Sequence, residues 1–198
     1  MGIIERRERL RRQVRTDILK TARDIAREEG WQAVSIRKIA EVIEYSPPML
    51  YEYFDNKDKL LETIRDEGFS HLHEEFAKTK TLYRSPEKQL IEFAQSQWRL
   101  ATEQPEVFQV MFNLDGAFCS SKQAYQLEFN MLNNHPVWEA LATIRPRSAD
   151  TVSKTFYEWW CLTYGFLTMT LVAQTRANVA QMEPIFMESV RRFVRGLV

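Results

Sequence analysis

The chain has 198 residues, of which 44% are hydrophobic and 27% charged, with only six glycines and seven prolines. This composition is typical of a globular protein with few turns and long helices, and it excludes the disordered and fibrous classes. The net charge is zero, so bulk electrostatics alone do not indicate a nucleic-acid binder. The first 27 residues nevertheless hold nine bases and four acids, which makes the N-terminus a basic arm.

The two cysteines and the apolar segments indicate where the protein resides. Cys119 and Cys161 lack a C-x-x-C spacing, which favours a reducing compartment, and the cytoplasm is the expected location. We expect no secretory signal, because no apolar stretch with a small-residue cleavage site opens the chain. The longest charge-free apolar run, Trp159 to Ala173, is shorter than the roughly 20 residues that span a bilayer. A buried helix is expected there, and no membrane partner.

The first third of the chain predicts four helices, over residues 14–29, 36–43, 46–54 and 57–76. The first ends before Gly30, the usual residue just past a helix end. Ser35, Ser46 and Asn56 can each cap the helix that follows. Two prolines follow Ser46 in the first turn, where their missing N–H groups do no harm.

The rest of the chain also predicts helices. They begin at Ser85-Pro86 and Val107 and, in the last part, cover Ala149 to about Gln174 and about Glu183 to Gly196. Pro184 is expected in the opening turn of the last helix. Residues 117–147 are interpreted as one broken helical hairpin.

Residues 35–54 have the spacing of a helix-turn-helix, whose second helix enters the major groove of DNA. The same spacing occurs in many all-α cores. A helical interaction protein without specific DNA binding is therefore the alternative to a DNA-binding protein.

Residues around this motif resemble the tetracycline-repressor (TetR) family. The resemblance covers roughly residues 14–61 and lies in Ile18–Ala22, Gly30-Trp31, Val34–Ala40, Ser46-Pro47, Leu50–Phe54 and Asn56–Leu60. It implies an all-α fold of about nine helices. An N-terminal three-helix helix-turn-helix domain with the basic arm would cover residues 1–61, and a C-terminal helical ligand-binding and dimerisation domain residues 62–198. It further implies a sequence-specific transcription regulator, most simply a repressor that a ligand releases from its operator.

Two positions depart from the family pattern. Glu44 and Pro48 stand where the family commonly has glycine. Because a side chain costs energy in a left-handed turn, we expect the turn at Glu44 to be built differently.

The resemblance implies a set of DNA-contacting positions in and around the two helices: Ser35, Arg37, Lys38, Ser46, Pro48, Met49, Tyr51, Tyr53 and Lys57. Ser35 can offer its hydroxyl to a phosphate, and Arg37 can bind guanine O6 and N7. Tyr51, Tyr53 and Lys57 match positions that hold the DNA backbone. Pro48 and Met49 favour apolar contacts with thymine methyls. The basic arm can lie along phosphates or in the minor groove.

The C-terminal region resembles, over Pro105–Phe112 and Trp160–Gly165, a TetR domain class named for a Trp, His, Gly signature, with Tyr164 in place of its histidine. We expect a cavity that binds an unknown, largely apolar small molecule. Its expected lining is rich in aromatic and methionine side chains: Trp98, Phe108, Met111, Phe112, Phe129, Phe156, Trp159, Trp160 and Tyr164. Each of these could equally be ordinary core packing.

The last two helices predict a homodimer. Phe186, Val190, Phe193 and Leu197 recur at spacings of four, three and four residues, as in a helix that packs against another helix. The alternative is that both helices complete a monomer core. A dimer would place two recognition helices on a near-palindromic double-stranded DNA operator.

Candidate catalytic and metal-binding groups are few. His71 and His73 are two residues apart, so they do not share a helix face as an i, i+4 metal pair does. His135 is expected to be a solvated loop residue, and Cys161 a core residue. No glycine-rich phosphate loop is present. We therefore expect no enzyme, no metal site and no cofactor.

Overall fold

A computed structural model describes residues 2–117, 135–144, 148–172 and 179–197 of the chain. The regular elements of these residues are nine α-helices and one short 3-10 helix, with no β-strand among them, which confirms the predicted all-α class. The chain divides into two compact units. The N-terminal unit is Met1–Gly68 with Glu106–Ser121, and the C-terminal unit is Phe69–Pro105 with Lys122–Val198. A functional boundary after residue 61 stays a prediction.

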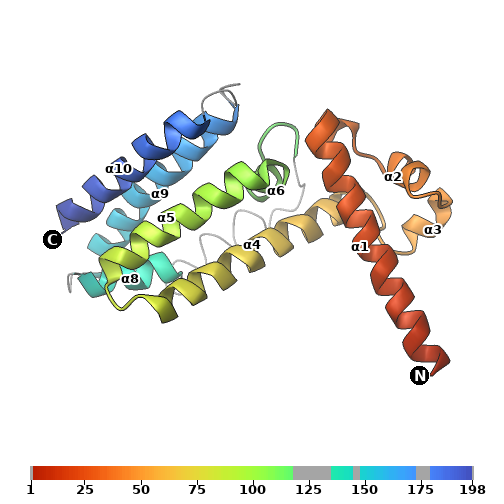
Figure 1. Ribbon diagram of the computed structural model, residues 1–198, viewed down its shortest axis with the longest axis horizontal. Coiled ribbons are helices and arrows are strands. Elements are labelled where there is room, and N and C mark those ends of the chain that lie inside the picture. The colour runs from red at the N-terminus through yellow and green to blue at the C-terminus, as the bar shows by residue number, and fades with distance from the viewer. Residues whose placement is uncertain (1, 118–134, 145–147, 173–178, 198) are drawn as a thin grey trace. The chain divides into compact units, whose positions relative to one another are not determined.

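The N-terminal unit consists of short helices packed on one long helix (Figure 1). Its elements are α1 (Ile3–Glu29), the 3-10 helix η1 (Trp31–Ala33), α2 (Ile36–Val42), α3 (Pro47–Tyr51), the first part of α4 (Lys57–Leu82), and α6 (Pro105–Met111). The residues that α1 buries are Val14, Ile18, Leu19, Ala22, Ile25 and Ala26. They recur every three or four residues, so one face of α1 is in the core.

Helix α1 is longer than its apolar stripe. It begins after Gly2, whose N–H donates to the Glu5 carboxylate at 3.0 Å, and it ends at Gly30, which has a positive φ of 85°. The N–H of Gly30 donates to the Ala26 carbonyl at 2.9 Å, which closes the last turn. The basic arm is thus the first part of a continuous helix, whose first buried side chain is Val14.

The C-terminal unit is a helical bundle around α5 (Pro86–Glu103). Helix α5 packs against α8 (Pro136–Ile144), α9 (Ala149–Val172) and α10 (Val179–Leu197), and α5, α9 and α10 lie side by side (Figure 1). Helix α5 begins where the sequence predicted, and Ser85 caps it by accepting from the Lys88 N–H at 3.2 Å. The largest side chains that this core buries completely include Phe76, Phe93, Trp159 and Phe186.

Two expectations for the last helices are wrong. Helix α10 begins at Val179, so Pro184 lies inside it and not in its opening turn. Cys161 is exposed on α9. Only one side of α9 is in the core, because its buried residues Trp159, Thr163 and Leu167 follow one another every four residues. Among the described residues, no helix is long and apolar enough to cross a membrane.

Candidate nucleic-acid interface

Helix α2 presents Arg37 to solvent because the opposite face of the helix is buried. Ser35 caps α2, as predicted, by accepting from the Lys38 N–H at 3.2 Å. Ile36 and Ile39 are buried, and Arg37 between them is exposed. The Lys38 ammonium donates to both oxygens of the Glu29 carboxylate, at 2.6 and 2.5 Å. Lys38 is therefore engaged within the protein.

The turn between α2 and α3 contains a left-handed residue. Glu44 has a φ of 58°, and the next residue, Tyr45, donates its N–H to the Ala40 carbonyl at 2.9 Å. The expectation that this turn is built differently is wrong. The reversal requires the positive φ, and the exposed Glu44 adopts it despite its side chain.

Helix α3 is a short helix that begins with two prolines. Ser46 precedes them, but its side chain makes no capping hydrogen bond, unlike the expectation from the sequence. The Ser46 carbonyl accepts from the Met49 N–H at 3.0 Å. Because Pro47 and Pro48 have no N–H, the helix start offers no donors from these two positions to a phosphate. Any nucleic-acid contact from these two positions would therefore use side chains.

Helix α3 ends at Tyr51 and so is shorter than predicted. Leu50 and Phe54 are buried in the core of the unit. This packing leaves Pro48 exposed and Tyr51 47% exposed, with Met49 and Tyr53 half-buried. Pro48 and Tyr51 are thus accessible from solvent.

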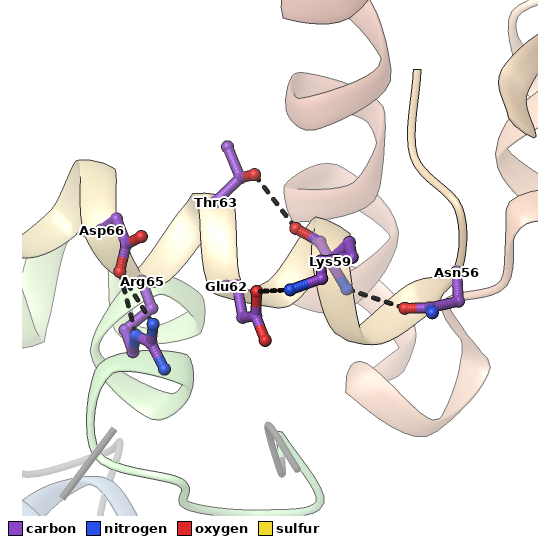
Figure 2. A network of polar contacts seen from close by, with 6 residues as sticks. All are labelled: Asn56, Lys59, Glu62, Thr63, Arg65 and Asp66. Carbon is purple, nitrogen blue, oxygen red and sulfur yellow. Dashed lines mark hydrogen bonds and ion pairs between the residues drawn. The ribbon is translucent and has the colours of Figure 1, made fainter. Parts of the chain in front are cut away.

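The start of α4 is held by a chain of polar contacts (Figure 2). The Asn56 side chain accepts from the Lys59 N–H at 2.9 Å, which confirms its role as a cap. The Lys59 ammonium lies 2.6 Å from the Glu62 carboxylate, and the Thr63 hydroxyl donates to the Lys59 carbonyl at 3.0 Å. In the next turn the buried Arg65 pairs with Asp66 at 2.9 Å.

The side chain of Lys57, in this first turn of α4, makes its contact within the protein. Its ammonium donates to the Trp31 carbonyl at 2.5 Å. Burial lowers the pKa of the Lys57 ammonium below its ordinary value, since the charged form loses solvation. Lys57 therefore braces the start of α4 against η1.

Helix α6 is part of the same unit through contacts that the sequence did not indicate. The Arg27 guanidinium lies 2.5 Å from the Glu106 carboxylate, and the Trp31 indole N–H donates to the Glu106 carbonyl at 2.9 Å. A Cβ added at Gly68 of α4 would meet Val107 and Met111 of α6 at 2.8 and 2.6 Å. The close approach of α4 and α6 therefore requires glycine at position 68.

The helix-turn-helix segment carries no net positive charge. Residues 35–57 include three bases, Arg37, Lys38 and Lys57, and four acids, Glu41, Glu44, Glu52 and Asp55. Two of the bases are engaged by Glu29 and by the Trp31 carbonyl. Among the described residues, Arg37 is the base of this segment whose side chain has neither an ion pair nor a hydrogen bond.

Comparison with known proteins identifies the family that part of this unit matches. Residues 18–64 match the family described as "Bacterial regulatory proteins, tetR family". The segment contains the capped helix-turn-helix described above. Residues 18–64 form a tetR-family domain. No curated protein matches the chain.

Solved structures share this fold over most of the chain. A protein from Syntrophomonas wolfei str. Goettingen, assigned to the TetR-family transcriptional regulators, has a TM-score of 0.72 and 14% identity over 95% of this chain and 98% of its own. A TetR-family transcriptional regulator from Bordetella parapertussis 12822 has a TM-score of 0.64 and 18% identity over 93% and 94%. A single-residue variant of TetR from Acinetobacter baumannii AYE, solved in complex with minocycline, has a TM-score of 0.59 and 14% identity over 90% and 93%.

The predicted ligand-lining residues fall into two groups. Phe108, Met111 and Phe112 belong to α6 or the turn after it, in the unit of the tetR-family domain, and the rings of Phe108 and Phe112 lie 4.5 Å apart. Trp98, Phe156, Trp159, Trp160 and Tyr164 belong to the C-terminal unit. Phe129 lies outside the described residues.

In the C-terminal unit, α9 carries a column of stacked rings. Trp160 stacks on Phe156 at 6.0 Å and on Tyr164 at 6.3 Å. Trp98 of α5 stacks instead on Phe186 of α10 at 5.1 Å, and Trp159 is fully buried. The structure therefore brings three of the predicted residues into one column and places the other two in the bundle core.

His135 is packed among rings and is not the solvated residue expected from sequence. Its ring lies 5.9 Å from Phe76, 5.3 Å from Phe156 and 6.3 Å from Trp160. Burial, with a smaller effect of the neighbouring His73, lowers its pKa to about 4. His135 is therefore neutral near pH 7.

Proposed function

We propose that the chain is a sequence-specific DNA-binding transcription regulator, a repressor that a small molecule releases from its operator. The observation that carries this proposal is the capped helix-turn-helix within the tetR-family segment, with Arg37, Pro48 and Tyr51 exposed. Leu50 and Phe54 anchor its second helix in the core. The alternative, a helical interaction protein, does not account for a recognition helix presented in this way.

The exposed residues divide into two roles. Arg37 can bind guanine O6 and N7, and Pro48 and Met49 can contact thymine methyls. Tyr51, Tyr53, Ser35 and Ser46 can reach phosphates through their hydroxyls. Lys38 and Lys57 would first have to leave Glu29 and the Trp31 carbonyl, so they contribute less net binding energy.

Selection of duplexes from a random-sequence pool, followed by footprinting, tests this proposal. We expect a near-palindromic site. Arg37→Ala should weaken binding by about 1–3 kcal/mol and relax the preference at one base pair of each half-site. Tyr51→Phe should weaken all sequences alike. A chain that enriches no sequence would favour the interaction protein.

A homodimer through α9 and α10 is supported by apolar side chains that the protomer leaves exposed. Tyr157 and Met169 of α9 and Ile185 of α10 are 40%, 67% and 50% exposed. Tyr157, Cys161, Gly165 and Met169 follow one another at four-residue spacing and form one stripe. Phe186 and Val190, expected in the interface, are buried within the protomer, whereas Phe193 and Leu197 remain half-exposed.

Gly165 provides a sharp test of the dimer. A Cβ at Gly165 meets nothing within 4 Å in the protomer. Gly165→Leu should therefore leave the protomer folded, and the better helix former should raise its helix stability by up to about 1 kcal/mol. In a dimer the same side chain would separate the stripes. We expect a shift to monomer by light scattering, and an unchanged dimer would contradict this interface.

The ligand is supported by buried polar atoms in the C-terminal unit. Gln97 Oε1 and Trp159 Nε1 are buried and find no hydrogen-bond partner among the described residues. Buried polar atoms in native proteins are nearly always paired. Both atoms belong to helices that pack on each other, α5 and α9. A neutral, largely apolar molecule that donates a hydrogen bond to Gln97 Oε1 and accepts one from Trp159 Nε1 would satisfy them.

A structural neighbour in complex with minocycline gives this proposal a parallel. A panel of apolar compounds with and without an amide or hydroxyl group should be measured for thermal stabilisation and for release of the selected DNA. Gln97→Leu should lose the preference for the hydrogen-bonding compounds. Compounds that bind without changing DNA affinity would contradict ligand-controlled repression. Membership of the Trp-His-Gly class rests on Trp160 and Gly165 and stays a proposal.

A further inference from the structure

The first three turns of α1 extend beyond the core of the tetR-family unit. Every described side chain from Ile4 to Gln13 is exposed, and Val14 is the first that is buried. At 1.5 Å per residue, residues 3–13 form a rod of about 16 Å. In Figure 1 this part of α1 runs past α2 and α3.

The arginines of α1 differ in how they are neutralised. Arg15 and Arg23 lie 3.6 and 3.8 Å from the Glu67 carboxylate, and Arg27 pairs with Glu106. The projecting part holds five arginines, Arg6, Arg7, Arg9, Arg11 and Arg12, and two glutamates. None of these five has an ion pair with the residues that the structure describes. Their charge is available to a partner.

The position of Arg11 shows which part of the protein surface these arginines extend. Its guanidinium carbon lies 5.9 Å from the centre of the Tyr53 ring, and Arg15 stands one turn along, 5.4 Å from the Phe54 ring. Arg7 precedes Arg11 by four residues and so lies on the same face. Arg7 and Arg11 therefore continue the surface that contains Tyr53.

We propose that the projecting part of α1, residues 3–13, binds the phosphate backbone of the DNA beside the operator, chiefly through Arg7 and Arg11. The inference rests on the proposed function. The helix-turn-helix supplies three bases against four acids, and two of those bases are engaged, so it cannot neutralise several phosphates. A protein–DNA complex needs such neutralisation for affinity. The projecting part supplies this neutralisation. Because it is a helix with a diameter of about 10–12 Å, it does not fit a minor groove about 6 Å wide.

The test compares the salt dependence of binding for the full chain and for Arg7→Gln/Arg11→Gln. The probes are a selected site trimmed to the base pairs that the selection enriches and the same site with about one helical turn, roughly 10 base pairs, added on each side. Each lost phosphate contact lowers the slope of log K against log salt by about 0.9, so a dimer losing four should lose about 4. The selected sequence should not change, and the wild-type chain should prefer the longer probe.

Lys78→Gln/Lys154→Gln is the matched control, because it removes the same charge from exposed positions of the C-terminal unit. It should leave the slope unchanged. An equal slope for the arginine variant and the wild type, or an equal effect of the lysine variant, would overturn the inference while leaving sequence-specific binding intact. A wild-type chain that binds no duplex even at low salt would instead overturn the proposed function, and this inference with it.

Discussion

Arg27 and Glu106, 79 residues apart in the chain, form an ion pair that fixes α6 to α1, with the Glu106 carboxylate buried and the Arg27 side chain half-exposed. The Arg27 Nη2 atom lies 2.5 Å from Glu106 Oε1, and the Glu106 side chain is only 1% exposed. The Glu106 hydrogen bond and charge raise the pKa of Arg27 above its ordinary value. Because α6 follows directly on α5 of the other unit, this pair lies where the two units are joined in sequence.

Arg27→Ala should destabilise the N-terminal unit by up to about 3 kcal/mol, because it leaves a buried carboxylate without its partner. Glu106→Gln, which keeps the shape and a neutral polar group, should cost less. Asp24→Ala is the control: Asp24 also lies 3.7 Å from Arg27, but both side chains there are about half exposed, so the loss should stay below about 1 kcal/mol. Urea unfolding measures all three, and equal losses would contradict a buried Glu106 carboxylate that depends on Arg27.

Gly68→Ala should destabilise the same unit although alanine favours helices. The new Cβ would lie 2.6 Å from Met111 Sδ and 2.8 Å from Val107 Cγ1, and such overpacking costs about 1–3 kcal/mol. This exceeds the gain in helix propensity of up to about 1 kcal/mol. Gly196→Ala, where nothing lies within 4 Å, should show no loss. Thermal melting distinguishes the two variants, and a Gly68→Ala protein as stable as wild type would mean that α6 does not approach α4 so closely.

Local signals in the sequence predicted the local structure well. Ser35, Asn56 and Ser85 cap helices as their side chains allow, and the apolar stripe from Val14 marks the buried face of α1. Each of these depends on residues a few positions apart, where helix geometry fixes the distances.

Contacts between distant segments could not be predicted in this way. The Lys57 ammonium reaches a backbone carbonyl 26 residues earlier, and no side-chain pattern marks a carbonyl as an acceptor. His135 is enclosed by rings from α4 and α9, which become its neighbours only when the bundle forms. The family resemblance therefore predicted Lys57 as a DNA contact, and nothing in the sequence indicated its partner inside the protein.

Glu44→Gly should stabilise the protein by roughly 0.5–1 kcal/mol. The left-handed φ of 58° costs a residue with a Cβ about 1–2 kcal/mol, and glycine removes this cost but loses some backbone entropy on folding. Glu44→Val should have the opposite effect, since a β-branched side chain is worse at positive φ. Glu44 is exposed, so neither change removes a core contact. Urea unfolding that ranks valine at or above glycine would exclude a left-handed turn in solution.

The free energy of unfolding should fall as the pH is lowered from about 7 toward about 5, because His135 is held neutral in the folded state. Its folded pKa of about 4 lies below the ordinary value of 6.5, so the unfolded chain takes up a proton first as the pH falls. Burial lowers the pKa of His73 as well, and His73 adds to the effect with the same sign.

The hydrogen bond of His135 allows its contribution to the pH dependence of stability to be measured separately. The Val137 N–H donates to His135 Nδ1 at 3.2 Å, which requires that nitrogen to be unprotonated and makes the histidine part of the α8 cap. His135→Asn keeps a capping acceptor but cannot titrate, so the loss of melting temperature between pH 7.5 and pH 5 should become smaller. His71→Asn, a change at an exposed position of α4, should keep the wild-type loss. If His135→Asn retained the full loss, other groups would have to account for the pH dependence.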